Sequence, residues 1–520
     1  MKLVLRVLAV AALTFAPQHH GVCAALAGDP LIARTHFIGS DRLFADPTAR
    51  KLKELWTLPG SVAFRNEALD RFAQLPGQYF GVNGTAKDTA LVRPLLEDLL
   101  AQESYVDFRA TPELVIAAKL SDARLKAWDS ILRQAVSNWK FAKPVAVNAD
   151  GFTGWEVKRA QAPQVFRFGR VGEWSVLTAG PEKSALGSQI VGNIRAQGRP
   201  AKLSGAWLDG DLNVSRVRGW LPILAGLENL PMAHFSFSNR ADFVRMLVTL
   251  DFPKPHNWKS EPWRVPTNHI FDPLSSFVTV RGIAPILDAI PEIKQVGWSP
   301  TPNQITGWAV RQLPFQFTYA APTHDVTSQL KRVGPAVKSL VQKGHSHWIG
   351  AVTQDSNTWD LRWSGLPLAV PRLGALRNSQ DFLSFEMFPL AATKSPAPHE
   401  LFQQIGRDNL VLYDWEITED RIPSWRQFYQ IAEITTRQSL APTNLPSARW
   451  VTGMMPKLGE TVTEITATSP SQMTLVRKSH SGLNAFELVT LGRWVESTNF
   501  PAFGTFLPRV PRPSRPPPGR

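Results

Sequence analysis

A six-residue pattern that occurs twice constrains the architecture of this chain more than any other feature. Residues Thr153–Lys158 read Thr-Gly-Trp-x-Val-basic, and residues Thr306–Arg311 repeat that pattern. Strand-like and helix-like periodicities follow in a similar order around both copies. Because self-similarity at a domain-sized interval indicates repeated structural units, the sequence predicts an α+β fold. We expect tandem repeated α+β units with mixed or antiparallel sheets, preceded by a short helical region.

The chain is long enough for several domains. It has 520 residues, whereas a single hydrophobic core stops growing at roughly 250 to 300 residues. Composition shifts and Pro-rich segments predict the following division: a signal peptide (1–27), a helical N-terminal region (28–103), a first α+β repeat (104–250), a Pro-rich linker with a second α+β repeat (251–375), a divergent third α+β unit (376–500) and a disordered Pro/Arg-rich tail (501–520).

The first 27 residues predict export. Lys2 and Arg6 form a basic start, Val7–Phe15 is apolar, and Ala25–Ala27 is a small-x-small cleavage site, which together are typical of a secretory signal peptide. The only cysteine, Cys23, lies in this segment, so the mature protein is expected to be free of disulfides. After residue 27 no stretch approaches the roughly 18 apolar residues of a spanning helix. We therefore expect an exported periplasmic, cell-envelope or extracellular protein with no transmembrane segment in its mature chain.

Charge and aromatic content indicate the class of partner. The formal charge is +14, from 57 Lys and Arg against 43 Asp and Glu. The basic residues never run more than two in a row, which is not the clustered basic face that nucleic acids require. A mildly basic exported protein favours anionic envelope polymers or glycans, with no nucleic acid. Most of the 18 tryptophans are expected to fill hydrophobic cores.

Asp414 and Glu416 are the candidate catalytic pair. On a strand both carboxylates point to one face, and glycoside hydrolysis uses two carboxylates near each other. Asp414–Glu416 also resembles the end of the Asp-x-x-Asp-x-Asp-Trp-Glu signature of chitinases of the glycoside hydrolase 18 type, although Asn409 and Leu412 occupy its other aspartate positions. The structural alternative is the solvated face of an edge strand.

His345 and His347 are the candidate metal ligands. If the segment is extended, both imidazoles face one side, with Asp355 or Asp360 as a third ligand. The alternative is a pair of surface histidines at the start of a strand. Because a zinc site needs at least three protein ligands, and because no nucleotide-binding or metalloprotease motif occurs, we expect no cofactor.

Trp258 and Trp263 are the candidate ligand-binding residues. They lie in the Pro-rich linker, where an exposed indole could stack on a sugar ring. The alternative is that both rings clamp the linker onto its neighbours, since tryptophan is rarely left fully exposed. The segment Asp209–Asn213 resembles the start of a calcium loop, but it lacks the Gly and Glu that such a loop needs and is expected to be a turn.

The signal peptide, the tryptophan-rich tandem α+β units and the absence of disulfides are together similar to a group of large uncharacterised exported proteins. These are domains of unknown function of planctomycete and verrucomicrobial type, and the resemblance covers roughly residues 40–500. It implies no functional residues. The predicted function is that of a non-catalytic envelope or periplasmic protein that binds or scaffolds an unknown ligand. The alternative is an exported hydrolase acting on glycans or cell-wall material.

Overall fold

The chain folds into two compact units, which are described one at a time. The computed structural model describes residues 31–76, 86–110, 113–139, 141–149, 151–158, 164–182, 184–202, 204–218, 226–240, 242–256, 261–311, 316–344, 349–366, 369–377, 379–388, 399–435, 442, 444–498 and 500–501. Unit 1 contains the described residues 31–218, 229–254 and 500–501, and unit 2 contains 226–228 and 255–498. The predicted signal peptide and residues 502–520 of the predicted tail lie outside the described residues.

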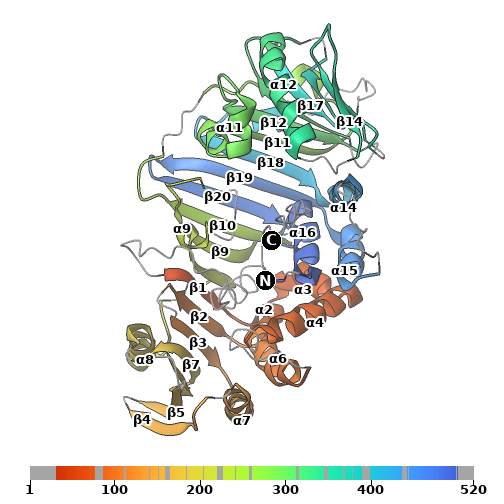
Figure 1. Cartoon of the computed structure of the whole chain (residues 1–520). Helices are drawn as coiled ribbons and strands as arrows, with labels where there is room; N and C mark the ends of the chain where they lie inside the picture. Colours follow the sequence, from red (N-terminus) through yellow and green to blue (C-terminus); the bar gives the residue numbers. More distant parts are fainter. Residues whose placement is uncertain are drawn as a thin grey trace, which may run out of the picture. The chain divides into compact units, whose positions relative to one another are not determined.

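The ten described strands of unit 1 pair in antiparallel fashion throughout (Figure 1). In the order in which they pair, they are β4 (Val145–Ala149), β5 (Phe152–Lys158), β6 (Gln164–Val171), β7 (Trp174–Pro181), β3 (Glu113–Lys119), β2 (Ser104–Arg109), β1 (Leu31–Phe37), β8 (Leu208–Asn213), β9 (Met232–Arg240) and β10 (Phe243–Asp251).

The described helices of unit 1 occupy the connections between these strands. They are α2 (Ser40–Ala45), η1 (Pro47–Ala49), α3 (Arg50–Thr57), α4 (Pro59–Ala73) and α6 (Ala86–Ala101) between β1 and β2, α7 (Asp122–Asn138) after β3, α8 (Ala185–Gln197) after β7 and α9 (Val214–Val217) after β8. Several begin at polar caps. Ser121 accepts from the backbone of Arg124 at the start of α7, and Ser184 accepts from that of Gly187 at the start of α8.

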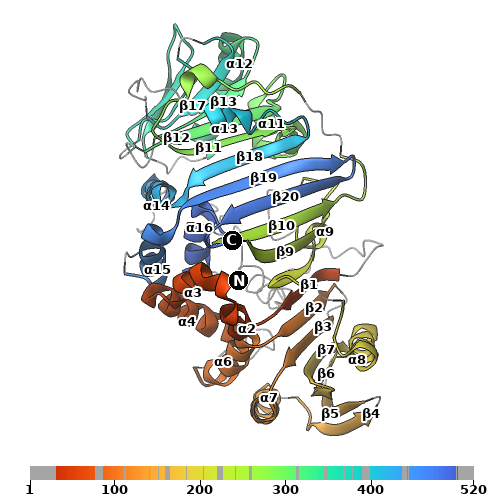
Figure 2. The same ribbon diagram turned by 180° about the vertical axis from the view of Figure 1, so that it is seen from behind.

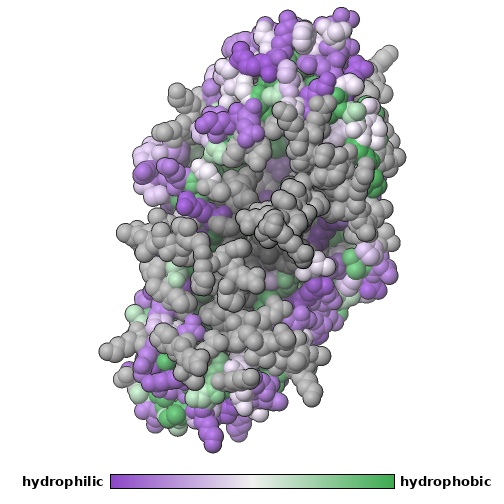
Figure 3. Space-filling model, in the orientation of Figure 1, coloured by the Kyte–Doolittle hydropathy of each residue, from purple (hydrophilic) through white to green (hydrophobic). Residues whose placement is uncertain are grey.

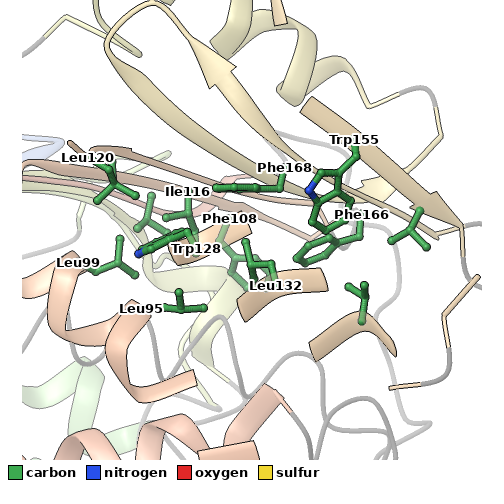
Figure 4. Close-up of a cluster of buried hydrophobic side chains, with 14 of the residues drawn as sticks. Leu95, Leu99, Phe108, Ile116, Leu120, Trp128, Leu132, Trp155, Phe166 and Phe168 are labelled. Carbon is green, nitrogen blue, oxygen red and sulfur yellow. The ribbon is translucent and has the colours of Figure 1, made fainter. Parts of the chain in front are cut away.

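Tryptophan fills the core of unit 1, as the sequence predicted. Helices α6 and α7 pack on one face of the sheet, where Trp128 stacks on Phe168 and Trp155 stacks on Phe166 (Figure 4). Each indole N–H also donates to a carboxylate: that of Trp128 to Asp98 at 2.7 Å, and that of Trp155 to Asp129 at 2.6 Å. The apolar ring and the polar N–H of each tryptophan are therefore both accommodated.

The ten described strands of unit 2 are also antiparallel. Their order is β14 (Ala351–Gln354), β15 (Leu361–Ser364), β16 (Arg372–Ala375), β17 (Phe382–Glu386), β13 (Phe317–Pro322), β12 (Gln304–Val310), β11 (Leu274–Arg281), β18 (Leu410–Ile417), β19 (Glu460–Ser469) and β20 (Gln472–Ser479). This order is the same as in unit 1. Each described strand of unit 2 has the same position in the order as the unit 1 strand whose label is lower by ten, so that β14 corresponds to β4 and β18 to β8.

The described helices of unit 2 are η4 (Thr267–His269), α10 (Ala284–Asp288), α11 (Pro291–Val296), α12 (Val326–Gly344), α13 (His399–Gln403), α14 (Thr418–Thr435), α15 (Pro446–Met454), η5 (Met455–Lys457) and α16 (Ala485–Glu496). Helices α14, α15 and α16 gather beside β18 and its neighbours, as the view from behind also shows (Figure 2). A separate apolar cluster, which includes Phe277, Trp308 and Tyr413, fills the other face of the sheet together with Phe402 of α13.

The α+β prediction is confirmed, and three details differ from expectation. The N-terminal helices connect β1 to β2 instead of preceding the sheet, because Leu31–Phe37 forms an inner strand. The described strands of residues 376–500 pair with β11, β13 and β16, so they share one sheet with the strands of residues 274–375. Asp209–Asn213 is strand and not turn. In addition, helix α12 continues through Pro335, which is exposed, so that water can solvate the carbonyl that the proline leaves without an N–H partner.

Among the described helices, none combines the length and the apolar character needed to cross a bilayer.

Candidate functional site

Strand β18 places Asp414 and Glu416 inside unit 2 and not at an edge. It lies between β11 and β19, with Asp414 opposite Val278 on one side and Thr463 on the other. Glu416 is buried and Asp414 is partly buried. Tyr413, on the opposite face of the strand, packs into the apolar cluster. The alternation of faces is as expected, but the expected solvated edge is wrong, because both partners of β18 come from distant parts of the sequence.

Glu416 anchors the start of a helix. Its Oε1 accepts from the backbone N–H of Ala485, the first residue of α16, at 2.7 Å, and from the hydroxyl of Thr418 at 3.0 Å. Asn484, the residue just before α16, forms a reciprocal capping box with Glu487. A carboxylate at a helix N-terminus satisfies an unpaired N–H and interacts favourably with the helix dipole. Glu416 therefore joins the sheet to α16.

Two arginines face the same polar cluster. Arg477 of β20 lies in one lateral row with Thr463 and Asp414, and it donates to the Thr463 hydroxyl at 2.8 Å and to Glu487 at 2.8 Å. Arg421 of α14 is buried, and its Nη1 has no hydrogen-bond partner among the described residues. With Glu416, these residues place cations and carboxylates together beneath α14 and α16.

Tyr319 completes the cluster from β13. Asp414, Val278, Gly307 and Tyr319 follow one another across the sheet in register. A Cβ added at Gly307 would lie 2.5 Å from the Tyr319 ring, so the missing side chain lets the ring lie across β12. In the second copy of the Thr-Gly-Trp pattern, the glycine thus makes room for a neighbouring aromatic ring.

The environment shifts the pKa values of this cluster. Burial and, to a lesser extent, the nearby Glu416 carboxylate raise the pKa of Asp414 to about 7. Burial also raises the pKa of Glu416 and of Tyr319, and it lowers the pKa of Arg421. The positive charges of Arg477 and Arg421 oppose the rise in the pKa of Asp414, but they do not outweigh the burial of its carboxyl.

The histidine candidates lie outside the described residues, but their proposed third ligands do not. Asp355 is exposed and accepts from the backbone of Asn357 and Thr358 at 2.8 and 2.9 Å, which makes it a turn cap. Asp360 is buried and bridged to Arg372. Within the described part of the chain, no group of three or more His, Cys, Asp or Glu side chains is placed to hold a metal ion.

Trp263 contacts its own chain on one ring face, whereas Trp258 lies outside the described residues. The Arg281 guanidinium lies 4.4 Å from the Trp263 ring centroid, and the ring packs against the apolar cluster of the sheet. Arg281 is itself buried and donates to the backbone carbonyls of Glu261 at 2.6 Å and Leu410 at 2.8 Å. These contacts hold the segment around Trp263 on unit 2 and cover part of the surface that a sugar would need.

A second polar cluster, in unit 1, is one that the sequence did not reveal. His36 of β1 lies between two carboxylates, with Nδ1 2.9 Å from Asp209 and Nε2 3.0 Å from Glu103. An ionised carboxylate only accepts hydrogen bonds, so both ring nitrogens donate and the imidazole is cationic. Burial opposes this charge, but the hydrogen bonds to the two carboxylates outweigh it and raise the pKa of His36.

The cluster continues across neighbouring strands. Arg34 of β1 contacts Asp107 of β2 at 3.0 Å and Asp211 of β8 at 3.4 Å, and Asp211 accepts from His234 of β9 at 2.6 Å. Its side chains range from the fully buried Asp107 to the half-exposed His234. The only sequence signal was that charged or titratable residues alternate in two segments, Arg34–His36 and Asp209–Asp211. In the second segment, however, the Asp-Gly-Asp string favoured a turn. Strand pairing alone brings these groups together.

Comparison with known proteins does not assign a function. No family model matches the chain, and no curated protein matches it. Two solved structures of TP0453, in crystal forms III and I, are 7% and 8% identical, cover 44% and 45% of this chain and 98% and 99% of theirs, and each have a TM-score of 0.22. A likeness of that size supports no argument about fold or function.

Proposed function

We propose that this chain is an exported, non-catalytic protein of the periplasm or cell envelope that binds or scaffolds an anionic polymer. One observation carries the non-catalytic part: the best catalytic candidates have structural contacts. Glu416 holds the N-terminus of α16, and Asp414 lies in an inner strand beside it. A carboxylate that attacks or protonates a substrate must instead reach the reacting atoms.

Export is supported by the signal-like segment. Its basic start, apolar stretch and small-x-small site precede the first described strand. The net charge is +14 for the whole chain and +12 without Lys2 and Arg6 of the predicted signal peptide. This positive charge favours an anionic partner outside the cell, such as a charged envelope glycan.

We also propose that the two units are a tandem duplication. The support is the strand order, which is the same in both units along all ten described positions. A second support is a register shift between the first two strands of each unit, after Leu31 in β1 and after Leu274 in β11. The Thr-Gly-Trp patterns do not mark equivalent positions, since they lie in β5 and β12, and the counterpart of β5 in this order is β15.

The test is co-sedimentation of the purified chain with insoluble anionic and neutral glycans, with reducing sugar assayed in the same supernatant. We expect retention on the anionic glycan that weakens with salt, without sugar release. Release of sugar above a protein-free control would overturn the non-catalytic function, and failure to bind either glycan would overturn the binding function.

An exported hydrolase acting on glycans is the second candidate, and the pKa of Asp414 favours it. A carboxyl with a pKa of about 7 next to a second carboxyl is the kind of pair in which one group serves as a general acid. In that case Asp414→Asn should abolish sugar release while the protein stays folded, as judged by circular dichroism.

A further inference from the structure

Helix α12 carries a one-sided positive charge. Its sequence from Val326 to Gly344 contains four basic residues and no Asp or Glu. Lys331 and Arg332 are exposed, and Lys338 is partly exposed one turn beyond Pro335. Lys331 and Lys338 are seven positions apart and share one side of the helix. Arg332, the neighbour of Lys331, lies about 100° around the helix axis from it, still away from the buried side. We call these three outward-facing cations the stripe.

The opposite side of α12 packs into the core of unit 2. Val326, Leu330 and Val333 are buried, and the first two pack in a cluster with Leu383 of β17. The outer surface therefore has no large apolar side chain at the described positions around the stripe. An interfacial helix needs such side chains to enter a bilayer, so the charge of α12 suits a hydrated polyanion better than a membrane.

The cations of the stripe are positioned without an ion pair, although Asp325, the residue just before α12, interacts electrostatically with Lys331. Lys331 lies 5.2 Å from the Trp359 ring centroid, and Arg332 donates to the carbonyl of Ser299 at 3.0 Å. Among the described residues, Lys331, Arg332 and Lys338 form no ion pair with an acidic side chain. Contacts with a ring face and a carbonyl restrict the side chains while leaving their charges available to a partner.

A neighbouring helix adds a fourth cation. Helix α11 packs against α12 (Figure 1), and its Lys294 is exposed and likewise forms no ion pair with a described residue. Gln329 of α12 donates to the Ser299 carbonyl at 2.6 Å, which fixes the start of α12 to the chain that follows α11. Hydrophilic side chains gather over the part of unit 2 that carries these helices (Figure 3).

We infer that the outer surface of α11 and α12, centred on Lys331, Arg332 and Lys338, is the docking surface for an anionic polysaccharide. The inference rests on the proposed function and names its surface and ligand class. Lys331 and Lys338 are about 10 Å apart along the helix axis at 1.5 Å per residue. Charges spread over that length suit an extended polymer that carries repeated carboxylates.

The experiment compares two triple variants of the full chain by biolayer interferometry on immobilised polygalacturonate, with neutral dextran as the blank. One variant is Lys331→Gln, Arg332→Gln, Lys338→Gln. The matched control is Arg195→Gln, Arg199→Gln, Lys202→Gln, which removes three exposed cations from unit 1. We expect the α12 variant to raise Kd about 10- to 100-fold and to flatten its salt dependence, and the control to stay within about twofold of wild type. Circular dichroism verifies that both variants are folded.

The possible outcomes separate the inference from the proposed function. If wild type binds and both variants lose affinity equally, net charge alone drives binding and the α12 surface is wrong. If wild type binds and the α12 variant binds as tightly, another surface is responsible and the proposed function survives. If wild type does not bind, both fail. Tighter binding to single-stranded poly(dT) or to phosphatidylglycerol vesicles than to polygalacturonate would overturn the polysaccharide assignment.

Discussion

Burial decides the charge of individual residues in this protein. Asp414 lies in an inner strand near a second carboxylate and two arginines, where desolvation keeps it protonated at a pH at which an exposed aspartate is ionised. His36 shows the opposite result, because two carboxylates stabilise the cationic ring despite its burial. Each shift links protonation to folding.

Replacing Asp414 should change how stability depends on pH. The pKa of Asp414 is raised to about 7 in the fold, so its contribution to stability is present below its unfolded pKa and is lost as pH rises towards 7. Asp414→Asn cannot ionise. We expect the variant to match wild type near pH 4 and to unfold with a free energy about 1–3 kcal/mol higher at pH 8.

Urea denaturation followed by tryptophan fluorescence at several pH values measures this difference. The matched control is Asp381→Asn, which removes an exposed carboxylate from the same unit and should leave the pH profile unchanged. Parallel profiles for wild type and Asp414→Asn would contradict the buried-acid interpretation.

Replacing His36 should remove a pH-dependent contribution to the stability of unit 1. Because the folded pKa of His36 is raised, its contribution is full below the unfolded pKa, about 6.5, and is lost as pH rises through the folded value. His36→Gln should lower the free energy of unfolding by about 2 kcal/mol at pH 5.5, as expected for hydrogen bonds to charged groups. The deficit should shrink above neutral pH, as measured by the same denaturation series. A deficit that stays constant from pH 5.5 to 9 would show that the ring is neutral.

At the scale of elements, two kinds of contact hold the helices in place: hydrogen bonds at the first turn, and packing of one apolar side against the rest of the unit. Helix α16 begins with a capping box and with the Glu416 carboxylate on its first N–H, and helix α12 buries its apolar side while leaving a cationic stripe outside. The capping residues of α7 and α16 are local signals. The anchoring carboxylate of α16 comes from 69 residues away.

Removing the cap of α16 should weaken the helix that covers the polar cluster. Asn484→Ala deletes the acceptor for the backbone N–H of Glu487 and should cost about 1 kcal/mol of unfolding free energy. Asn484→Ser keeps a side-chain oxygen and should recover most of that loss. Thermal denaturation of the three proteins tests this, and equal midpoints for Ala and Ser would show that the cap contributes nothing.

At the scale of the whole molecule, each unit has its own core and the two cores use different residues. Trp128 is buried in unit 1 and Trp494 in unit 2. A large aromatic side chain is therefore buried in each unit, and its removal is expected to act first on the unit that contains it.

Truncating a core tryptophan should loosen the unit that contains it. Trp128→Ala leaves a large cavity and should cost about 3–5 kcal/mol. Hydrogen exchange should then accelerate more in β2, β3 and α7 than in β11, β18 and α16, with the reverse pattern for Trp494→Ala. Equal acceleration in both units would show that they unfold as one cooperative body.

The sequence by itself determined the local features of this protein. The cap of α7, the alternating faces of β18 and the β19–β20 hairpin are such features, because they depend on residues within a few positions of one another. Apolar tryptophans predicted the cores. Only the tertiary structure decided that Asp414 and Glu416 are covered, that the Asp-Gly-Asp string is an inner strand, and that His36 lies between two carboxylates. The physical reason is that strand pairing joins residues far apart in the chain, and the burial that sets their charges follows from that pairing.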